Sequence, residues 1–359
     1  MKAVIIAGGL GTRLRPLTYN IPKPIVPVVN RPFVEYQIEM LKSHGIDEII
    51  LNLHYLSDEI KKILGDGRRM GVKLHYSIES TPLGTAGAVK KAEEYFKDAK
   101  LLVVFNGDIL TDINISEVVE FHKQNQARAT LTLTEVEDPT TYGLVLTDKD
   151  KRVTQFIEKP SWERVEGLDK KEINAGIYVL DTAIFKDVPK HTPVMFERAV
   201  FPDLLKNGER VFGYSSHAYW IDIGNPQKYK LAHEAVLRGD VTSFRIYGSR
   251  EKGSIYIDTD VEIDQTAKII GPAVIGKRAR IEANTLIKSF TVLGERVTVG
   301  HDSKLEDCII WSGTRIGNNV KLNGCILGYN CRIEDGVSIQ KGGIIADNTV
   351  ISKGSVINA

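Results

Sequence analysis

A glycine-rich loop with a basic residue follows the first apolar segment of the chain. The loop reads Gly8, Gly9, Leu10, Gly11, Thr12, Arg13. Glycines after a strand let backbone amides approach a phosphate chain closely, and a guanidinium suits phosphate oxygens because it donates two parallel hydrogen bonds. A tight structural turn would also explain the glycines alone. The loop is therefore a candidate phosphate site, with Arg13 as its cation.

Two familiar nucleotide loops do not match this one. A Walker loop ends in Gly-Lys-Ser/Thr, whereas this loop has Gly11-Thr12-Arg13. The dinucleotide fingerprint needs a third glycine where Leu14 stands, and an acidic residue about 20 positions on. The segment there, Val29-Asn30-Arg31, has none. Another kind of nucleotide site is expected.

Lys23 stands between two prolines in the same part of the chain. Pro22 and Pro24 stiffen the backbone on either side of the lysine. A lone loop lysine is usually only solvated, but a rigidly held ammonium suits a fixed phosphate. Arg13 and Lys23 together favour phosphate binding.

Two carboxylates follow apolar strands. Asp108 comes after the segment 101–105, and Asp222 ends Trp220-Ile221-Asp222. A carboxylate at the carboxyl end of a parallel strand points to the ligand crevice, although a turn or cap role is equally open. Two such groups would suit Mg²⁺, which prefers hard oxygen ligands. The sequence alone does not show that they meet.

Two further segments carry polar groups suited to a base and to a sugar phosphate. The segment 79–87 contains Glu79, Pro82, Gly84 and Thr85. Its glycines could pack against a base, and the Glu79 carboxylate could accept hydrogen bonds from N1 and N2 of guanine. A structural helix entry explains the glycines as well. Lys159, with the acceptors Glu158 and Asn174, is a reasonable composition for a phosphosugar site.

The N-terminal part alternates strand-like and helical patterns. Short apolar runs occupy 2–7, 48–55, 72–78 and 101–105, and apolar residues recur at helical spacing over 33–41 and 60–64. Strands separated by crossover helices pair in parallel, with ligands beyond their carboxyl ends. A mostly parallel, Rossmann-like α/β domain is predicted.

From about residue 255 a period of six replaces the helical pattern. Large aliphatic residues run from Ile257 to Leu305 at steps of six, and two single deletions precede Ile310 and Leu327. A hexapeptide period predicts a parallel β-helix with the aliphatic side chains inside. The three cysteines, Cys308, Cys325 and Cys331, fall at the small position of the repeat. Packing is the expected role of these thiols, with a reactive or metal-binding role as the alternative.

The bulk composition excludes some partners. With 47 basic and 46 acidic residues, the chain has no electrostatic footprint for nucleic acid or an anionic membrane. No apolar run approaches the ~20 residues of a membrane helix, and the N-terminal apolar stretch is too short for a signal peptide. A cytoplasmic protein with domains at 1–240 and 241–359 is expected.

The run from Gly8 to Pro24, G-G-L-G-T-R-L-R-P-L-T followed by P-K-P, resembles the signature of sugar-1-phosphate nucleotidyltransferases. The resemblance covers nearly the whole chain, and the chain looks most like the mannose-1-phosphate guanylyltransferases. The segment 196–202 is similar to a stretch in those enzymes. The fold implied is a GT-A-like nucleotidyltransferase domain followed by a left-handed β-helix.

The resemblance implies a role for each candidate residue. Asp108 and Asp222 match the metal-binding pair for Mg²⁺, and Arg13 and Lys23 match the catalytic cations. Nucleotide contacts fall on Gly8, Gly9, Gly11, Thr12, Arg13, Glu79, Pro82, Gly84 and Thr85. Sugar-phosphate contacts fall on Gly143, Glu158, Lys159 and Asn174.

The reaction implied joins a nucleoside triphosphate to a hexose 1-phosphate, with GTP and mannose 1-phosphate as the first choice. Thymidylyl, uridylyl and adenylyl transfer are alternatives. Acyl transfer by the β-helix would need a histidine base, for which the repeat offers His301. A regulatory subunit without activity is disfavoured because the signature cations and carboxylates are present. The β-helix is expected to make a homo-oligomer.

Overall fold

The computed structural model describes residues 1–251, 253–340 and 342–358. Its contacts divide the chain into two compact units. Unit 1 contains Met1–Leu10 and Val34–Asp222, and unit 2 contains Gly11–Phe33 and Ile223–Ala359. The segment that carries Arg13 and Lys23 therefore groups with the C-terminal part of the chain. A domain boundary near residue 240 stays a prediction.

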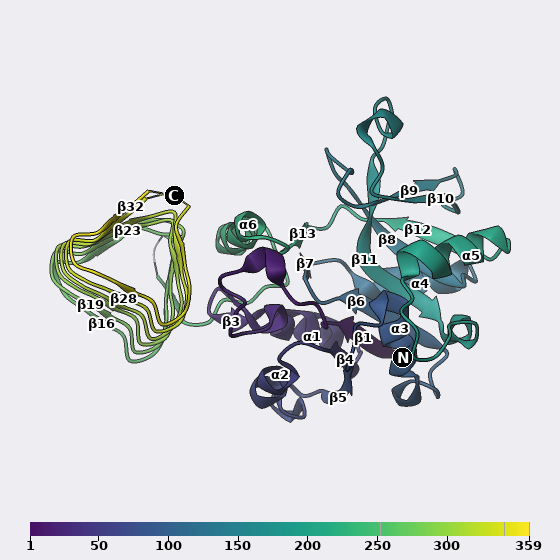
Figure 1. Ribbon diagram of the computed structural model, residues 1–359, viewed down its shortest axis with the longest axis horizontal. Helices are drawn as coiled ribbons and strands as arrows, with labels where there is room; N and C mark the ends of the chain where they lie inside the picture. Colours follow the sequence, from purple (N-terminus) through teal and green to yellow (C-terminus); the bar gives the residue numbers. More distant parts are fainter. Residues whose placement is uncertain (252, 341, 359) are drawn as a thin grey trace. The chain divides into compact units, whose positions relative to one another are not determined.

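Unit 1 is built on a nine-stranded sheet. Its strands are β1 (Lys2–Ile6), β4 (Glu48–Leu53), β5 (Lys73–Ile78), β6 (Leu101–Asn106), β8 (Ala129–Glu135), β9 (Gly143–Thr147), β10 (Val153–Glu158), β11 (Glu172–Asp181) and β12 (Val211–Ser215). The main path runs β10-β9-β11-β6-β1-β4-β5, and β8 pairs with β11 and β12 (Figure 1). The four strands expected in the first part of the sequence are confirmed.

Strand direction changes across this sheet. The strands β5, β4, β1 and β6 are parallel neighbours, as the alternation of strands and helices predicts. Strand β11 runs antiparallel to β6, β8 and β9. The Rossmann-like character thus belongs to the N-terminal strands, and the sheet beyond β11 is mixed, because β12 pairs in parallel with β8.

Helices in unit 1 connect these strands and cover the sheet. They are α1 (Phe33–Ser43), α2 (Ser57–Leu64), α3 (Gly84–Lys91), α4 (Ile115–Gln124) and α5 (Phe201–Lys206). Shorter turns are η3 (Arg68–Met70), η4 (Glu93–Tyr95), η5 (Trp162–Arg164) and η6 (Thr182–Lys186), and η7 (Phe196–Val200) is a π-helix. Both helices expected from apolar spacing, α1 and α2, are present.

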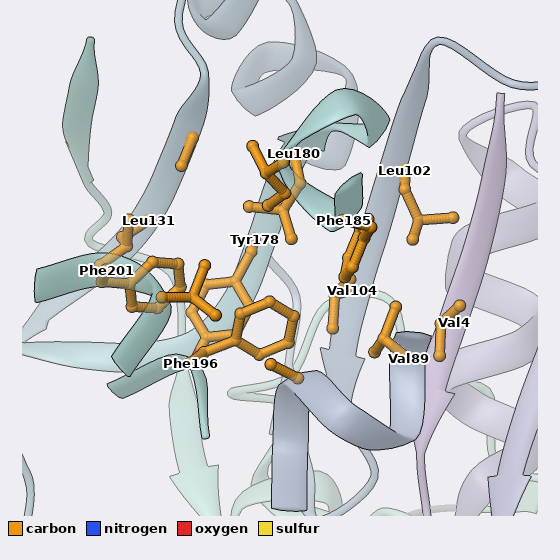
Figure 2. Close-up of a cluster of buried hydrophobic side chains, with 14 of the residues drawn as sticks. Val4, Val89, Leu102, Val104, Leu131, Tyr178, Leu180, Phe185, Phe196 and Phe201 are labelled. Atoms are coloured by element: carbon orange, nitrogen blue, oxygen red, sulfur yellow. The ribbon is translucent and has the colours of Figure 1, made fainter. Parts of the chain in front are cut away.

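One large core lies between the sheet, α3 and the segment that contains η7 and α5. Val89 of α3 packs with Val4 and Val104, while Phe196 and Phe201 surround Tyr178 (Figure 2). The Tyr178 ring centroid lies 5.5 Å from that of Phe196 and 5.0 Å from that of Phe201. The aromatic cluster therefore fixes α3, β11 and η7 against one another.

A short two-stranded sheet lies beyond the end of β6. It pairs β7 (Ile109–Thr111) antiparallel with β13 (Trp220–Asp222), and Asp222 is opposite Ile109. Asp108 is the residue directly before Ile109. This pairing brings together two segments that are far apart in the sequence.

Unit 2 begins with two short turns and a hairpin. These elements are η1 (Thr12–Leu14), η2 (Lys23–Ile25), β2 (Pro27–Val28) and β3 (Arg31–Pro32). The hairpin turns at Val29 and Asn30, both in the left-handed region with φ of 46° and 67°. Positive φ at both central residues is typical of a two-residue turn that matches strand twist. Helix α6 (Pro226–Arg238) belongs to the same unit.

The rest of unit 2 is a left-handed β-helix of three sheets, seen end-on as a triangle in Figure 1, whose strands pair in parallel except that β14 runs antiparallel to β15. One sheet contains β14 (Ser249–Glu251), β15 (Ile255–Ile257), β18 (Ala273–Ile275), β21 (Thr291–Leu293), β24 (Ile309–Ile310), β27 (Ile326–Leu327) and β30 (Ile344–Ile345). The second contains β16 (Glu262–Ile263), β19 (Arg280–Ile281), β22 (Thr298–Val299), β25 (Arg315–Ile316), β28 (Arg332–Ile333) and β31 (Val350–Ile351). The third contains β17 (Lys268–Ile269), β20 (Leu286–Ile287), β23 (Lys304–Glu306), β26 (Lys321–Asn323), β29 (Ser338–Ile339) and β32 (Val356–Ile357).

The hexapeptide register predicted the β-helix interior correctly. The repeated aliphatic residues from Ile275 to Ile339 form one buried cluster, in which all three cysteines take part. Cys308 Sγ lies 3.7 Å from Cys325 Sγ of the next coil, and Cys331 Sγ contacts the Ala346 carbonyl at 3.1 Å. The thiols are free and buried, which supports packing as their role.

Within unit 2, the β-helix and α6 hold the hairpin through buried polar groups. Asn30 Nδ2 donates to the Leu293 carbonyl at 2.7 Å. Tyr229 donates its hydroxyl hydrogen to the Pro27 carbonyl and accepts a hydrogen bond from Trp311 Nε1 at 3.1 Å. The hairpin that follows the signature run is therefore tied to the β-helix directly by Asn30 and indirectly through Tyr229 of α6.

His233 of α6 completes the support of the hairpin. The Val29 amide donates to His233 Nδ1 at 3.4 Å, and Nε2 lies 3.2 Å from the Pro27 carbonyl. Burial lowers the pKa of His233 to about 3. The ring is neutral at physiological pH, with its proton on Nε2.

The described residues contain no helix that is both long enough and apolar enough to cross a membrane.

Candidate functional site

The glycine loop continues β1 at the carboxyl edge of the parallel strands. The Ala7 amide donates to the Asn52 carbonyl at 2.9 Å, which extends the pairing of β1 with β4. Gly8 lies against the next strand ends, because a Cβ there would be 3.4 Å from His54 Cβ and 3.6 Å from Glu79 Oε1. Gly8 and Gly9 are therefore at the edge where the sequence predicts ligand binding.

The continuation of this loop in unit 2 is a compact turn around Gly11. Gly11 has φ 64°, which favours glycine, and its carbonyl accepts from the Thr18 hydroxyl at 2.7 Å. A Cβ on Gly11 would lie 3.3 Å from Lys23 Cβ, so Lys23 begins η2 beside the turn. Thr12 and Arg13 are exposed. The predicted cation Lys23 and the glycine turn are thus neighbours.

Glu79 holds its own loop with one carboxylate oxygen. Its Oε2 accepts from the Leu83 amide at 2.8 Å, while Oε1 lies on the Gly8 side. The His54 ring contacts the Glu79 carbonyl at 2.9 Å. The side chain is 6% exposed, and burial raises the pKa of the Glu79 carboxyl. A role in reading a base stays a prediction for Glu79, with Oε1 as the oxygen nearer the phosphate loop.

The start of α3 is packed against the segment before η7. The Ala86 and Gly87 amides both donate to the Val194 carbonyl at 3.0 Å. Gly84 has φ 69°, and a Cβ there would come within 2.6 Å of the Val194 oxygen. The Ala86 and Gly87 amides already donate their hydrogen bonds to Val194. Close packing against Val194 therefore explains the glycines. Pro82, by contrast, is exposed.

The chain segments that carry Asp108 and Asp222 meet at the β7–β13 pair. Asp222 is opposite Ile109 in the antiparallel register, so Asp108 lies one residue from this pair. Asp222 is 8% exposed, and its Oδ1 accepts from the Tyr142 hydroxyl at 3.0 Å. The structure therefore supplies the proximity that the sequence could not show.

The oxygen donors at this position suit a hard divalent cation. Mg²⁺ is commonly held by one or two carboxylates together with substrate phosphates, rather than by a full protein cage. The described residues contain no group of three or more His, Cys, Asp and Glu side chains arranged for a metal. A metal role for Asp108 and Asp222 stays a prediction.

The predicted sugar-phosphate residues gather at β9, β10 and β11. Gly143 pairs with Glu158, and a Cβ on Gly143 would lie 3.2 Å from Glu158 Oε2 and 2.6 Å from Phe156 Cζ. Lys159 follows with φ 50°, its amide donating to the Tyr142 carbonyl at 2.8 Å, and its side chain is exposed. The absence of a side chain at Gly143 lets the Phe156 ring and the Glu158 carboxylate approach its backbone closely.

Asn174 lies in an irregular stretch of β11. The β11–β8 register shifts between Asn174 and Tyr178, and bulges of this kind often re-aim side chains beside active sites. Gly176 in this stretch has φ 75°, and its amide donates to Asn174 Oδ1 at 3.1 Å. Strand β9 meets β11 here, because Leu144 pairs with Ile173. Asn174 is therefore near the Gly143–Glu158 pair.

Sequence reasoning assigned no role to two aromatic residues that connect these groups. The Tyr142 and Trp220 rings pack edge to face, with centroids 5.6 Å apart. Trp220 Nε1 donates to the Ala175 carbonyl at 2.9 Å, while Tyr142 reaches Asp222. Tyr142 directly precedes Gly143, and Trp220 lies two residues before Asp222. This closeness in sequence to predicted site residues was the signal that could have identified both aromatic residues.

Comparison with known families identifies the N-terminal part of the chain. A family model described as nucleotidyl transferase matches residues 2–239. The chain belongs to this nucleotidyl transferase family. A second model, the EIF2B subunit epsilon left-handed β-helix domain, matches residues 252–357.

Two relatives of this nucleotidyl transferase match most of its length. A mannose-1-phosphate guanylyltransferase from Mycobacterium tuberculosis is 33% identical over 84% of this chain and 82% of its own. A UTP–glucose-1-phosphate uridylyltransferase from Synechocystis is 32% identical over 88% of this chain and 84% of its own. The crystal structure of HddC from Yersinia pseudotuberculosis matches with a TM-score of 0.57 and 33% identity, over 66% of this chain and 99% of that one. The expected class, a sugar-1-phosphate nucleotidyltransferase, is confirmed.

The residue proposed for acyl transfer lies on the outside of the β-helix. His301 is exposed, and its Nδ1 contacts Asp302 Oδ2 at 2.7 Å on the neighbouring residue. An exposed pair of adjacent residues is the ordinary arrangement of a solvated coil turn. The nucleotidyl transferase assignment is the one that the comparisons support.

Proposed function

We propose that this nucleotidyl transferase joins GMP from GTP to mannose 1-phosphate and releases pyrophosphate. Two of the relatives named above differ in their base and sugar, and the guanylyltransferase matches at 33% identity over most of both chains. The observation that carries the proposal is the β7–β13 pairing, which brings the segments of Asp108 and Asp222 together in the unit that also contains Gly8 and Gly9.

The proposed reaction is an in-line displacement at the α-phosphorus of the nucleotide. A phosphate oxygen of the sugar phosphate attacks, the bond from the α-phosphorus to the bridging oxygen breaks, and pyrophosphate leaves with the electron pair. The nucleophile is already anionic near neutral pH, since the second pKa of a phosphate monoester is about 6. No general base is needed, and catalysis comes from positioning and charge neutralisation.

Each charged side chain has one task in this proposal. Arg13 holds the departing phosphates through a bidentate contact, and Lys23 neutralises charge at the α-phosphate. Lys159 orients the attacking phosphate, and Asp108 and Asp222 hold Mg²⁺. When bound, Mg²⁺ supplies charge neutralisation at the triphosphate oxygens.

The test of the function is pyrophosphate release with Mg²⁺ over a grid of nucleoside triphosphates and hexose 1-phosphates. A dominant signal for GTP with mannose 1-phosphate supports the proposal, whereas UTP with glucose 1-phosphate would move the assignment toward the Synechocystis relative. Silence from folded protein over the whole grid would refute the catalytic proposal.

A matched pair of variants separates the metal site from general damage. Asp108→Asn removes a proposed ligand, and turnover should fall by at least about a hundredfold. Asp112→Asn is the control on the same segment. Its Oδ1 accepts from the Tyr219 amide at 2.9 Å, which an amide oxygen can also do, so turnover should be unchanged.

The proposal includes a homo-oligomer formed through the β-helix, and a cytoplasmic location. The last strands of the β-helix, β31 and β32, end their sheets and expose Val350 and Val356 to 57% and 63%. Sheet edges with apolar side chains are suited to pairing with another copy. Light scattering after size exclusion of wild type and Val356→Lys tests this: a shift of the variant to the monomer mass supports it, and identical masses would contradict it.

A further inference from the structure

Glu197 connects the start of α3 to Asn174 through hydrogen bonds at both of its carboxylate oxygens. The Thr85 hydroxyl lies 2.9 Å from Oε2, and the Tyr178 hydroxyl lies 3.2 Å from Oε1. Asn174 Nδ2 lies 2.7 Å from the Tyr178 hydroxyl. All four residues belong to unit 1 and come from three different elements.

The direction of every hydrogen bond in this network is determined by its neighbours. The Phe196 amide donates to the Thr85 hydroxyl at 2.9 Å, so the hydroxyl hydrogen of Thr85 is available for Glu197. Asn174 Nδ2 donates to Tyr178, which in turn directs its hydrogen at Glu197. Glu197 therefore accepts both hydrogen bonds.

Because of this network, the Asn174 amide can adopt only one orientation. Its Oδ1 accepts from the Gly176 amide at 3.1 Å, and its Nδ2 must then face Tyr178. One N–H of Nδ2 and one lone pair of Oδ1 remain for a ligand. The reversed amide would oppose the Gly176 donor with an NH₂ group and leave it unsatisfied.

Two independent features mark this network as more than a core contact. Glu197 is half-buried in a π-helix, a rare backbone form that is frequent at functional sites. The Tyr178 ring is held on all sides by aromatic and aliphatic neighbours (Figure 2). Its hydroxyl is therefore a fixed point from which the position of Asn174 is determined. Burial raises the pKa of Glu197, and the Glu158 carboxylate adds to this rise.

We infer that Glu197 is a positioning residue that, through Tyr178, orients the Asn174 amide toward the sugar and, through Thr85, holds the first turn of α3. This inference rests on the proposed function, because it assigns Asn174 to the hexose. It identifies the chemistry that Asn174 offers: one N–H donor and one carbonyl acceptor, suited to a sugar hydroxyl that both accepts and donates. Glu197 itself need not touch the substrate.

The experiment compares steady-state kinetics of wild type, Glu197→Gln, Tyr178→Phe and the double variant, with the best substrate pair from the grid. An amide at position 197 cannot accept both hydrogen bonds, and Tyr178→Phe removes the anchor of Asn174. Each single variant should raise KM for the hexose 1-phosphate about tenfold, which is the value of about one hydrogen bond. For Tyr178→Phe, KM for the nucleotide should change less than about twofold.

The double variant distinguishes positioning through Tyr178 from a separate effect. Its KM for the hexose 1-phosphate should equal that of the single variants, because the same contact is lost once. Thr132→Val is the matched control, since its buried hydroxyl donates to the Ile177 carbonyl at 3.0 Å beside the same strand but outside the network. It should lose thermal stability and keep both KM values.

The outcomes separate the two proposals. Any of three results would overturn the role of Glu197. The first is a double variant in which the effects of the two single variants multiply. The others are equal changes in both KM values for Tyr178→Phe, and a lower melting temperature with unchanged KM for both single variants. Wild type without turnover on any substrate pair would instead overturn the proposed function, and this inference with it.

Discussion

Removing the hydroxyl of Tyr229 tests the connection between the β-helix and the β2–β3 hairpin. In Tyr229→Phe, Trp311 Nε1 loses the acceptor that it contacts at 3.1 Å. The Pro27 carbonyl loses the Tyr229 donor but keeps His233 Nε2 at 3.2 Å. The buried Trp311 donor is therefore the group left without a partner, while the Pro27 acceptor is still satisfied.

The expected cost follows from that asymmetry. A buried donor without a partner costs about 1–3 kcal/mol, and the ring of Phe fills the same space as that of Tyr. We expect unit 2 to lose about 2 kcal/mol, which corresponds to a fall in melting temperature of about 4–8 °C for a unit of this size.

Differential scanning calorimetry measures the loss, and hydrogen–deuterium exchange of the peptide over 23–33 locates it. That peptide should exchange faster in Tyr229→Phe. The control is Tyr214→Phe, which removes a solvent-accessible hydrogen bond to Glu117 Oε2 at 2.9 Å and should cost under about 1 kcal/mol. Equal melting temperatures for wild type and Tyr229→Phe, with equal exchange over 23–33, would refute the claim that this hydroxyl supports the β2–β3 hairpin.

Three other measurements address the remaining parts of the molecule. Gly143→Ala puts a Cβ 2.6 Å from Phe156 Cζ, so KM for the hexose 1-phosphate should rise about tenfold or more; unchanged kinetics would show that β9 can shift. Thr85→Val should lower turnover and raise KM for the nucleotide, because the hydrogen bonds to Phe196 and Glu197 are both lost; a variant with wild-type values would argue against α3 as a nucleotide element. His233 has its pKa lowered to about 3 in the folded state and about 6.5 when unfolded, so the unfolded state binds more protons between these values and stability falls as pH falls. Urea unfolding of unit 2 should show a loss of about 2 kcal/mol from pH 7 to pH 5, and His233→Gln should reduce that loss.

Local patterns were sufficient to predict most of the fold. The hexapeptide register located the β-helix interior from Ile257 onward because each coil contacts only its neighbours, so that one repeat specifies the next. The strands β1, β4, β5 and β6 were also readable, since buried parallel strands are short continuous apolar runs. The antiparallel direction of β11 was not, because it depends on which strands lie beside it.

Candidate site residues could be named from the sequence, but the contacts between them could not. Asp108 and Asp222 follow apolar strands, yet only the pairing of two three-residue strands brings them together. The network of Thr85, Tyr178 and Glu197 joins positions that no short motif spans. In the sequence its members look like ordinary core and helix residues. Only the register of β11 and the π-helix bring their side chains into hydrogen-bonding contact.

The grouping of residues 11–33 with the β-helix has a consequence for how this protein can be divided or recombined. A chain ended near residue 240 would keep Tyr229 and His233 but would lack Trp311 and the Leu293 carbonyl, so the hairpin after Lys23 would lose part of its scaffold. A transferable unit is therefore discontinuous in sequence. When this β-helix is grafted onto another catalytic domain, the hairpin and α6 must be transferred together with it. In genetic terms, a single crossover at the apparent domain junction separates parts that have to match, and a chimera that keeps unit 2 intact needs three junctions, at 10/11, 33/34 and 222/223.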